Sequence, residues 1–367
     1  MQNNTRDGQL DYLKSFGMLL VTAGHCGVPG GDLISLFHMP LFFFLSGYLF
    51  HWRPIKEFVK KKILSLYIPF VIYEIVFLAL RSIFFKMNFY CKESWSWMQP
   101  LVSITQTKTE LIHIILFDNV DELLAPLWFC TALFFASLTY CIIYRLKYKS
   151  KIRMLCILFV LGFTIKISGV NIASSINFSN VLSVAMVATF FFGFGNIFKE
   201  LDGFNYLVKI FRGKFVVFII SILLLLSSYI LGLRGGMLTL SYNNLFLFWV
   251  ASLCGVVSFY ILITWFYEHN ILVKVFALMG RNTFHIMALQ LIGIKFSSII
   301  ISHMLGMNMT KALEYYGFPP YFNSCEKIIG CILTFVICGL MGFVISAFSS
   351  FLSNKLMMSP KNAKEKN

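Results

Sequence analysis

Charged residues are scarce in this sequence: Asp, Glu, Lys and Arg make up 13% of the 367 residues, about half the share found in soluble globular domains. Hydrophobic residues, which include 41 Phe, make up 58%. This balance excludes a soluble enzyme and a disordered chain, because neither class carries so much apolar sequence. Several apolar runs reach the ~20 residues that a helix needs to cross a membrane. The composition therefore predicts a polytopic membrane protein.

Cysteine pairs at metal-binding or redox spacing are also missing. The nine cysteines form no Cys-x-x-Cys pair, and most lie in apolar runs, where cysteine packs as a small hydrophobic residue. A zinc-finger or disulfide scaffold is excluded, although Cys91 and Cys325 fall in connecting segments that can share one side, which leaves a disulfide between them open. No cleavable signal is evident, because the first apolar run contains Lys14 and no small-residue cleavage pattern follows it.

The apolar runs predict an all-α fold, a transmembrane bundle of about ten spans. The predicted spans cover residues 10–27, 33–51, 63–85, 126–144, 154–170, 181–198, 215–233, 243–266, 283–303 and 328–353. We expect residues 1–356 to form a single transmembrane domain and residues 357–367 to form a polar tail.

The basic residues give the bundle an orientation. The net charge is +15, but Lys and Arg form short clusters between apolar runs, which favours topology signals over a nucleic-acid surface. With a cytoplasmic N-terminus, most of the 31 Lys and Arg residues lie on the cytoplasmic side, as the positive-inside rule requires. Both termini are therefore predicted to be cytoplasmic, and the longest connecting segment, 87–125, to be external.

The first span carries the densest group of ionisable residues: Asp11, Lys14 and His25. A charged residue costs at least ~2.5 kcal/mol in the centre of a span, so such residues are functional candidates. Lys14 and His25 share a helix face but lie about 16 Å apart along the axis. This spacing suits an anionic donor held at Lys14 whose reactive end reaches His25, which can serve as a general base. The alternative is that Lys14 snorkels to the interface and His25 lies at a wet helix end.

Three segments in the first half of the chain form a recognisable set. They read LDYLKSFGMLLVTAGH at 10–25, FHMPLFFFLSGYLF at 37–50 and KKKILSLYIPFVIY at 60–73, and PLWFCTALF at 126–134 and GRNTFHIMALQ at 280–290 follow. The set resembles the integral-membrane acyltransferase family 3, whose first helix carries a basic residue, ten intervening residues and a histidine. The resemblance spans most of the chain, and the second segment makes it specific.

The resemblance implies transfer of an acyl group, usually acetyl from acetyl-CoA, to a hydroxyl of a sugar or related envelope molecule. It implies His25 as the catalytic residue, Lys14 as the donor-side residue, and a place in a bacterial cytoplasmic membrane. Two departures matter. Lys14 stands where the family commonly has Arg, so it lacks the bidentate guanidinium fork, and Gln290 stands where related chains often have His.

Further pocket or supporting residues are Asp11, His38, Ser46, Glu74, Trp128, Asn282 and Gln290. For His38 and Ser46 the alternative is a helix kink, and for Trp128 it is an interfacial aromatic belt. Glu74 shares a helix face with Arg81, which predicts an intramembrane pair that serves either as an acidic relay or as packing. Lys295 is interpreted as a snorkelling residue near a span end.

The predicted reaction needs no bound cofactor, with acyl-CoA as the donor substrate and a glycan or lipid-linked glycan as the acceptor. The sequence shows no phosphate-binding loop, dinucleotide fingerprint or metal-ligand spacing, and the partners expected besides these substrates are membrane lipids. Direct transfer and an acyl-histidine intermediate both stay open, as does the oligomeric state. The competing function is a polysaccharide-lipid flippase or another secondary transporter, because ten spans with intramembrane charges also suit translocation.

Overall fold

The computed structural model describes residues 8–90, 104–169 and 176–357, without the side chains of 176–178 and 352–357. These residues form helices and connecting turns and contain no strand, so the all-α prediction is confirmed. Cys91, part of the predicted external segment and the tail after residue 357 lie outside the described residues.

In the first half of the chain the helices are α1 (Gly8–Cys26), α2 (Gly31–Ser35), α3 (His38–Tyr48), α4 (Ile55–Lys62), the π-helix η1 (Ile63–Tyr67), α5 (Ile68–Lys86), α6 (Ile104–Ile115), the 3-10 helix η2 (Glu122–Leu127), α7 (Trp128–Ile143) and α8 (Tyr148–Ser168). In the second half they are α9 (Ile176–Glu200), α10 (Gly203–Ile210), α11 (Lys214–Ile230), α12 (Leu245–Glu268), α13 (Val273–Arg281), α14 (Thr283–Met304), α15 (Met309–Ala312) and α16 (Ser324–Met357).

Among the described residues, six helical stretches are long and apolar enough to cross a membrane, or seven when the bent pair of α10 and α11 is taken as one span. Every predicted span contains a helix, but the expected number of about ten is not reached. α8 carries Lys151, Arg153 and Lys166, which makes it more polar than the six. These findings confirm a multi-pass helical membrane protein and leave the orientation of the termini as a prediction.

The expected second span at 33–51 is broken into α2 and α3. The Leu36 carbonyl at the break accepts a hydrogen bond from the Ser252 hydroxyl of α12 at 2.9 Å. Phe37 packs directly against Gly255, where a Cβ atom would lie 2.4 Å from the Phe37 Cβ. The break is therefore fixed by contacts with α12, and α3, with 11 residues, is too short to span the bilayer alone.

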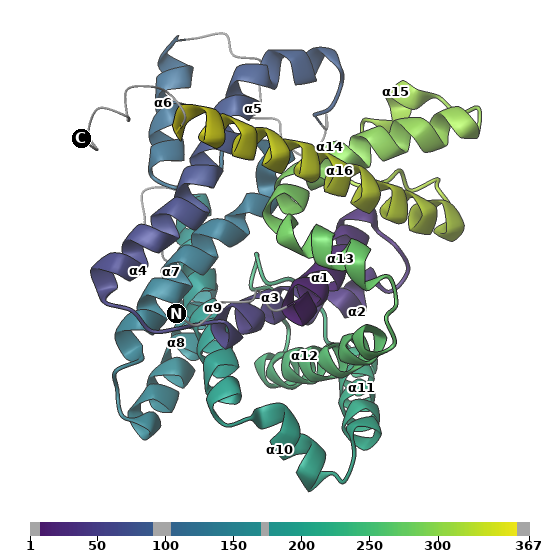
Figure 1. Ribbon diagram of the computed structural model, residues 1–367. Helices are drawn as coiled ribbons and strands as arrows, with labels where there is room; N and C mark the ends of the chain where they lie inside the picture. Colours follow the sequence, from purple (N-terminus) through teal and green to yellow (C-terminus); the bar gives the residue numbers. More distant parts are fainter. Residues whose placement is uncertain (1–7, 91–103, 170–175, 358–367) are drawn as a thin grey trace.

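α1 is the central helix of the bundle. It packs against α3, α12, α13, α14 and α16, and Figure 1 shows it in the middle of these elements. Neighbouring helices therefore shield much of its surface, which explains how it accommodates Asp11, Lys14 and His25 and why it is less apolar than the six spans. By contrast, Ile72 and Ile83 of α5 are more than half exposed, as expected for a helix that faces lipid.

Candidate active site

His25 lies in the last turn of α1 and is half-buried. It lines a cavity of about 530 Å³ together with His38, Asp32, Ser35 and the turn at 27–31. The turn contains Gly27 and Gly30, whose φ angles of 64° and 86° are left-handed values that glycine adopts without strain. This turn forms one wall of the open cavity.

His38, at the start of α3, faces the same cavity as His25. Its Nδ1 lies 2.8 Å from the Ile34 carbonyl oxygen. Because a carbonyl only accepts, Nδ1 carries the hydrogen, and in the neutral ring Nε2 is then an acceptor. The structure thus brings together two of the predicted site residues, and it places the second imidazole as a hydrogen-bonding group of the cavity wall.

His25 also lines a second, smaller cavity. It has a volume of about 30 Å³ and is lined mostly by apolar side chains, including Trp128, Met287 and Phe129. Trp128 begins α7 directly after η2, so the predicted tryptophan reaches the site from a third part of the chain. His25 therefore lines both an open cavity that contains polar side chains and a narrow apolar one.

Tyr316 covers His25 from the connection between α15 and α16. The two ring centroids are 6.2 Å apart, and the Cβ of a side chain at Gly317 would lie 2.5 Å from the His25 carbonyl oxygen. Burial raises the pKa of Tyr316, and the charge of Glu122 adds to the effect. The phenol therefore stays protonated at physiological pH and can donate a hydrogen bond.

Lys295 holds this connection in place. The side chain is 1% exposed, and its ammonium donates to the carbonyl oxygens of Leu313 and Tyr315, the first at 2.8 Å. The interpretation of Lys295 as a snorkelling residue was wrong, because the ammonium points into the protein and not to an interface. Sequence reasoning missed both Lys295 and Tyr316, since only the tertiary fold brings residues 313–317 to α1.

Lys14 and Asp11 lie near the opposite end of α1 from His25. The Lys14 ammonium is 3.6 Å from one carboxylate oxygen of Asp11, and Arg281 Nε is 3.7 Å from the other. α1 runs without interruption from Gly8 to Cys26, so the separation of about 16 Å between Lys14 and His25 along the axis holds. Arg281 was not among the predicted site residues, although it belongs to the GRNTFHIMALQ segment.

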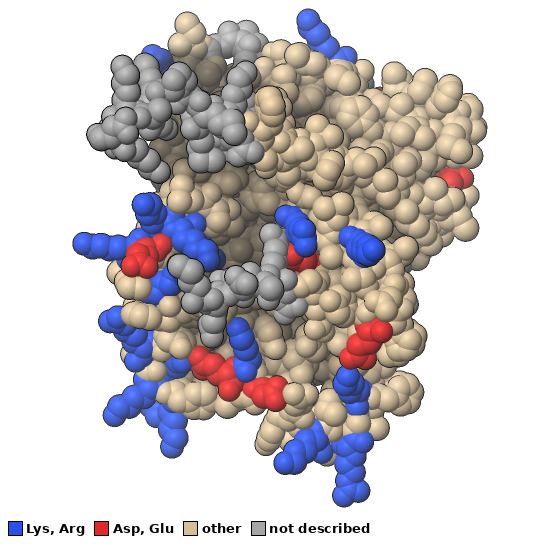
Figure 2. Space-filling model, in the orientation of Figure 1, with Lys and Arg blue, Asp and Glu red and all other residues tan. Residues whose placement is uncertain are grey.

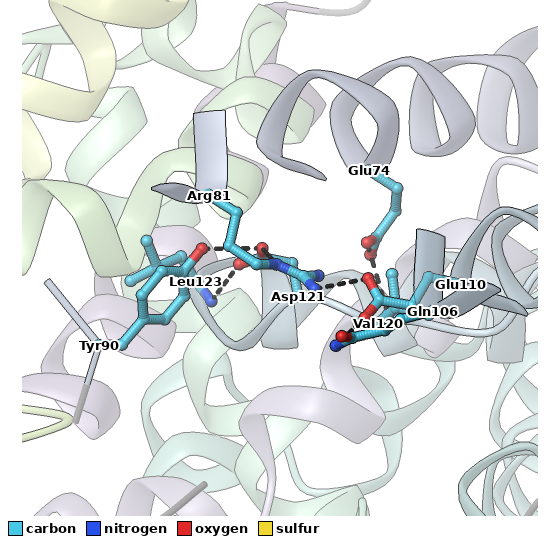
Figure 3. A network of polar contacts seen from close by, with 8 residues as sticks. All are labelled: Glu74, Arg81, Tyr90, Gln106, Glu110, Val120, Asp121 and Leu123. Carbon is cyan, nitrogen blue, oxygen red and sulfur yellow. Dashed lines mark hydrogen bonds and ion pairs between the residues drawn. The ribbon is translucent and has the colours of Figure 1, made fainter. Parts of the chain in front are cut away.

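Glu74 and Arg81 are fully buried in α5, but they do not form the expected ion pair. Arg81 pairs with Glu110 of α6 and with Asp121, whose carboxylate oxygen lies 3.5 Å from Arg81 Nε. Asp121 also accepts a hydrogen bond from the Tyr90 hydroxyl at 2.9 Å, and Glu74 accepts one from the Val120 amide at 3.4 Å. Figure 3 shows this network, which ties α5 to α6 and to the start of η2.

The predicted supporting residues Ser46, Asn282 and Gln290 do not line the two cavities at His25. Ser46 precedes Gly47, where α3 crosses α9 so closely that a Cβ would lie 1.7 Å from the Phe192 carbonyl oxygen. Asn282 accepts a hydrogen bond from Ser346 at 2.7 Å and so joins α14 to α16. Gln290 is fully buried, and neither polar atom of its amide has a hydrogen-bond partner among the described residues.

The basic residues at 60–62 divide between two surroundings. Lys60 and Lys61 line a surface hollow of about 440 Å³ with Arg53 and Glu57, whereas the Lys62 ammonium lies 5.4 Å from the Phe58 ring centroid. Figure 2 shows Lys and Arg side chains over α4, α8 and α10 on one face. The described residues hold no group of three or more His, Cys, Asp or Glu suited to a metal ion.

In a comparison with protein families, the family model described as an acyltransferase domain matches residues 7–351. The match includes both cavities, the Asp11 cluster and the buried network. Neither the search of curated proteins nor the search of solved structures found a match.

Proposed function

Since the chain belongs to the acyltransferase family 3 of membrane proteins, we propose that it transfers an acyl group, with acetyl as the expected group, from acyl-CoA to a hydroxyl of a surface polysaccharide or its lipid-linked precursor. The observation that carries the proposal is that His25 lines both the open cavity with His38, Asp32 and Ser35 and the small apolar cavity. A hydroxylated acceptor suits the larger cavity with its polar side chains, and a small acyl group suits the apolar cavity.

His25 acts as the general base in this reaction. Its imidazole takes the proton of the acceptor hydroxyl while the hydroxyl oxygen bonds to the thioester carbonyl carbon. The carbon–sulfur bond then breaks, and the thiolate takes the proton from the imidazolium. Asp32, Ser35 and His38 offer the acceptor further hydrogen-bonding groups, as a ligand with several hydroxyls requires. The alternative route, through an acyl-imidazole, passes the acyl group to His25 first.

The family assignment favours this function over the flippase or secondary transporter. A carrier moves the glycan unchanged, whereas the proposed enzyme leaves a new ester on it. The decisive experiment incubates the purified protein in lipid nanodiscs with labelled acetyl-CoA and candidate glycan intermediates, followed by mass spectrometry of the glycans. An ester that requires the protein supports the proposal; glycan movement without ester formation supports the carrier.

Replacement of His25 tests the catalytic assignment. His25→Ala and His25→Gln should both fold and insert but lose acyl transfer by roughly 10²-fold or more, since general-base catalysis contributes ~10²–10⁴-fold. His269→Gln is the matched control, because His269 is an exposed histidine directly after α12. Substantial transfer by His25→Gln at matched protein levels would remove His25 from the chemistry. A labelled acyl group trapped on the wild-type protein, and absent from the variant, would select the acyl-imidazole route.

Replacement of Lys14 tests the donor side. Lys14→Ala should raise the KM for acyl-CoA more than Lys14→Arg, because Arg keeps the positive charge and can contact phosphate. The measurement is donor KM at saturating acceptor. Equal donor dependence of the two variants, with normal folding, would exclude Lys14 from the donor site.

A further inference from the structure

One buried carboxylate lies between two basic side chains at the end of α1 opposite His25. Asp11 is 2% exposed, and its two oxygens face Lys14 at 3.6 Å and Arg281 at 3.7 Å. The Lys14 side chain is 28% exposed and the Arg281 side chain 55%. One carboxylate thus holds two cations that both reach solvent, and the trio has a net charge of +1.

The backbone around Arg281 is built to bring it to this point. A Cβ on Gly280 would lie 1.8 Å from the Asp11 carbonyl oxygen, so only glycine permits α13 to cross α1 at this distance. The Tyr12 hydroxyl also donates to the Ile271 carbonyl at 2.6 Å, which anchors the segment that leads into α13. Two contacts that do not involve the Arg281 guanidinium therefore place Arg281 beside Asp11.

The guanidinium is held in a way that leaves most of its donors available. Nε faces Asp11, and the described residues provide no hydrogen bond to the two Nη groups. These groups can bind two oxygens of one phosphate in parallel, which a lysine ammonium cannot do. Asp11 lowers the cost of bringing two cations together, because it offsets the repulsion between them. A simple ion pair between α1 and α13 would need one cation, and it would not need that cation to be exposed.

We propose that Arg281 and Lys14 together bind the phosphate groups of the acyl-CoA donor, with Arg281 as the bidentate ligand and Asp11 as the residue that positions both. The inference rests on the proposed function for the identity of the donor. In this arrangement Arg281 of α13 supplies the guanidinium that the lysine at position 14 of α1 does not provide. The distance of about 16 Å between this cluster and His25 along α1 suits a donor with a phosphorylated end, a long arm and a thioester at the far end. Figure 2 shows basic side chains beside an acidic one over the region of α1 and α13, next to a recess in this face.

The test measures equilibrium binding of CoA and of pantetheine, which shares the thiol arm but lacks the phosphates, to the full-length protein in nanodiscs. Arg281→Lys keeps the charge and removes the fork, and Arg281→Gln removes both. Lys274→Gln is the matched control, since Lys274 is an exposed basic residue of the same helix. We expect Arg281→Lys to weaken CoA binding about tenfold, as for the loss of one charge-assisted contact, and Arg281→Gln to weaken it further. Pantetheine binding and the control should match the wild type.

Wild-type affinity of both Arg281 variants for CoA would overturn the inference, and so would equal losses for CoA and pantetheine, which would mark a structural role. Failure of the proposed function is a separate result. If the wild-type protein binds CoA but forms no ester with any acceptor, the enzyme assignment fails while the phosphate site is still decided by the binding series. If the wild-type protein binds no CoA, both fail.

Discussion

Within the buried network of α5, α6 and η2, replacement of Arg81 should lower the free energy of unfolding most. Its side chain is fully buried, as is that of Asp121, and Glu110 is 16% exposed. Arg81→Met keeps an apolar side chain of similar length but leaves the buried carboxylates without their cation. Removal of one partner from a buried ion pair costs ~3–5 kcal/mol. This is a large share of the ~5–15 kcal/mol that stabilises a typical folded protein.

The assay is reversible denaturation in one defined detergent, monitored by fluorescence. Arg153→Met is the control, because Arg153 is an exposed arginine of α8. The control should stay within about 0.5 kcal/mol of the wild type. The combined variant Arg81→Met, Asp121→Asn, Glu110→Gln should recover most of the loss, because it removes the stranded charges together with the cation. An Arg81→Met protein as stable as the control would refute the reasoning, and so would a combined variant less stable than Arg81→Met.

Three further results are expected. Gly280→Ala should lower stability and weaken CoA binding, because its Cβ would lie 1.8 Å from the Asp11 carbonyl oxygen. In the control Gly24→Ala the new Cβ meets no atom within 4 Å, so stability should be unchanged or improved; equal stabilities of the two variants would contradict this reasoning. Lys295→Met should reduce kcat more than donor KM by releasing the connection that carries Tyr316, and steady-state kinetics with unchanged kcat would exclude that positioning role. In a chain without Cys91 and Cys156, an impermeant maleimide should label Cys325 from outside and Lys147→Cys only in inverted vesicles. The reverse pattern would overturn the predicted orientation.

The periodic, helix-based part of the site was predictable from the sequence. Asp11, Lys14 and His25 lie on one helix, and helical geometry alone gives the distance between them. Charged residues in an apolar segment also identify that helix as one that faces protein and not lipid. The family-like second segment led to His38, and the structure places this residue in the same cavity as His25.

Contacts between distant segments were not predictable in the same way. Arg81 and Glu74 are seven residues apart on α5, which suggested a pair, but Arg81 is neutralised by Glu110 and Asp121 from elements that follow a long connection. The break between α2 and α3 lies directly before His38, where a helix kink was the alternative, but the contacts that fix it could not be predicted. By hydropathy, 33–51 is one apolar run. In the structure the Leu36 carbonyl accepts a hydrogen bond from the Ser252 hydroxyl, which replaces a helical hydrogen bond and so satisfies the backbone at the break.

In the proposed donor site, Arg281 supplies from a second helix the guanidinium that Lys14 lacks. The ammonium of Lys14 lacks the bidentate fork with which an arginine binds a phosphate. A residue on a different helix can supply that fork only if its backbone comes close to α1, and Gly280 permits that approach. The useful sequence signal was therefore the small residue before the arginine, not the arginine alone. A glycine that precedes a basic residue can therefore mark a point where two helices cross, since it brings the next side chain to the neighbouring helix.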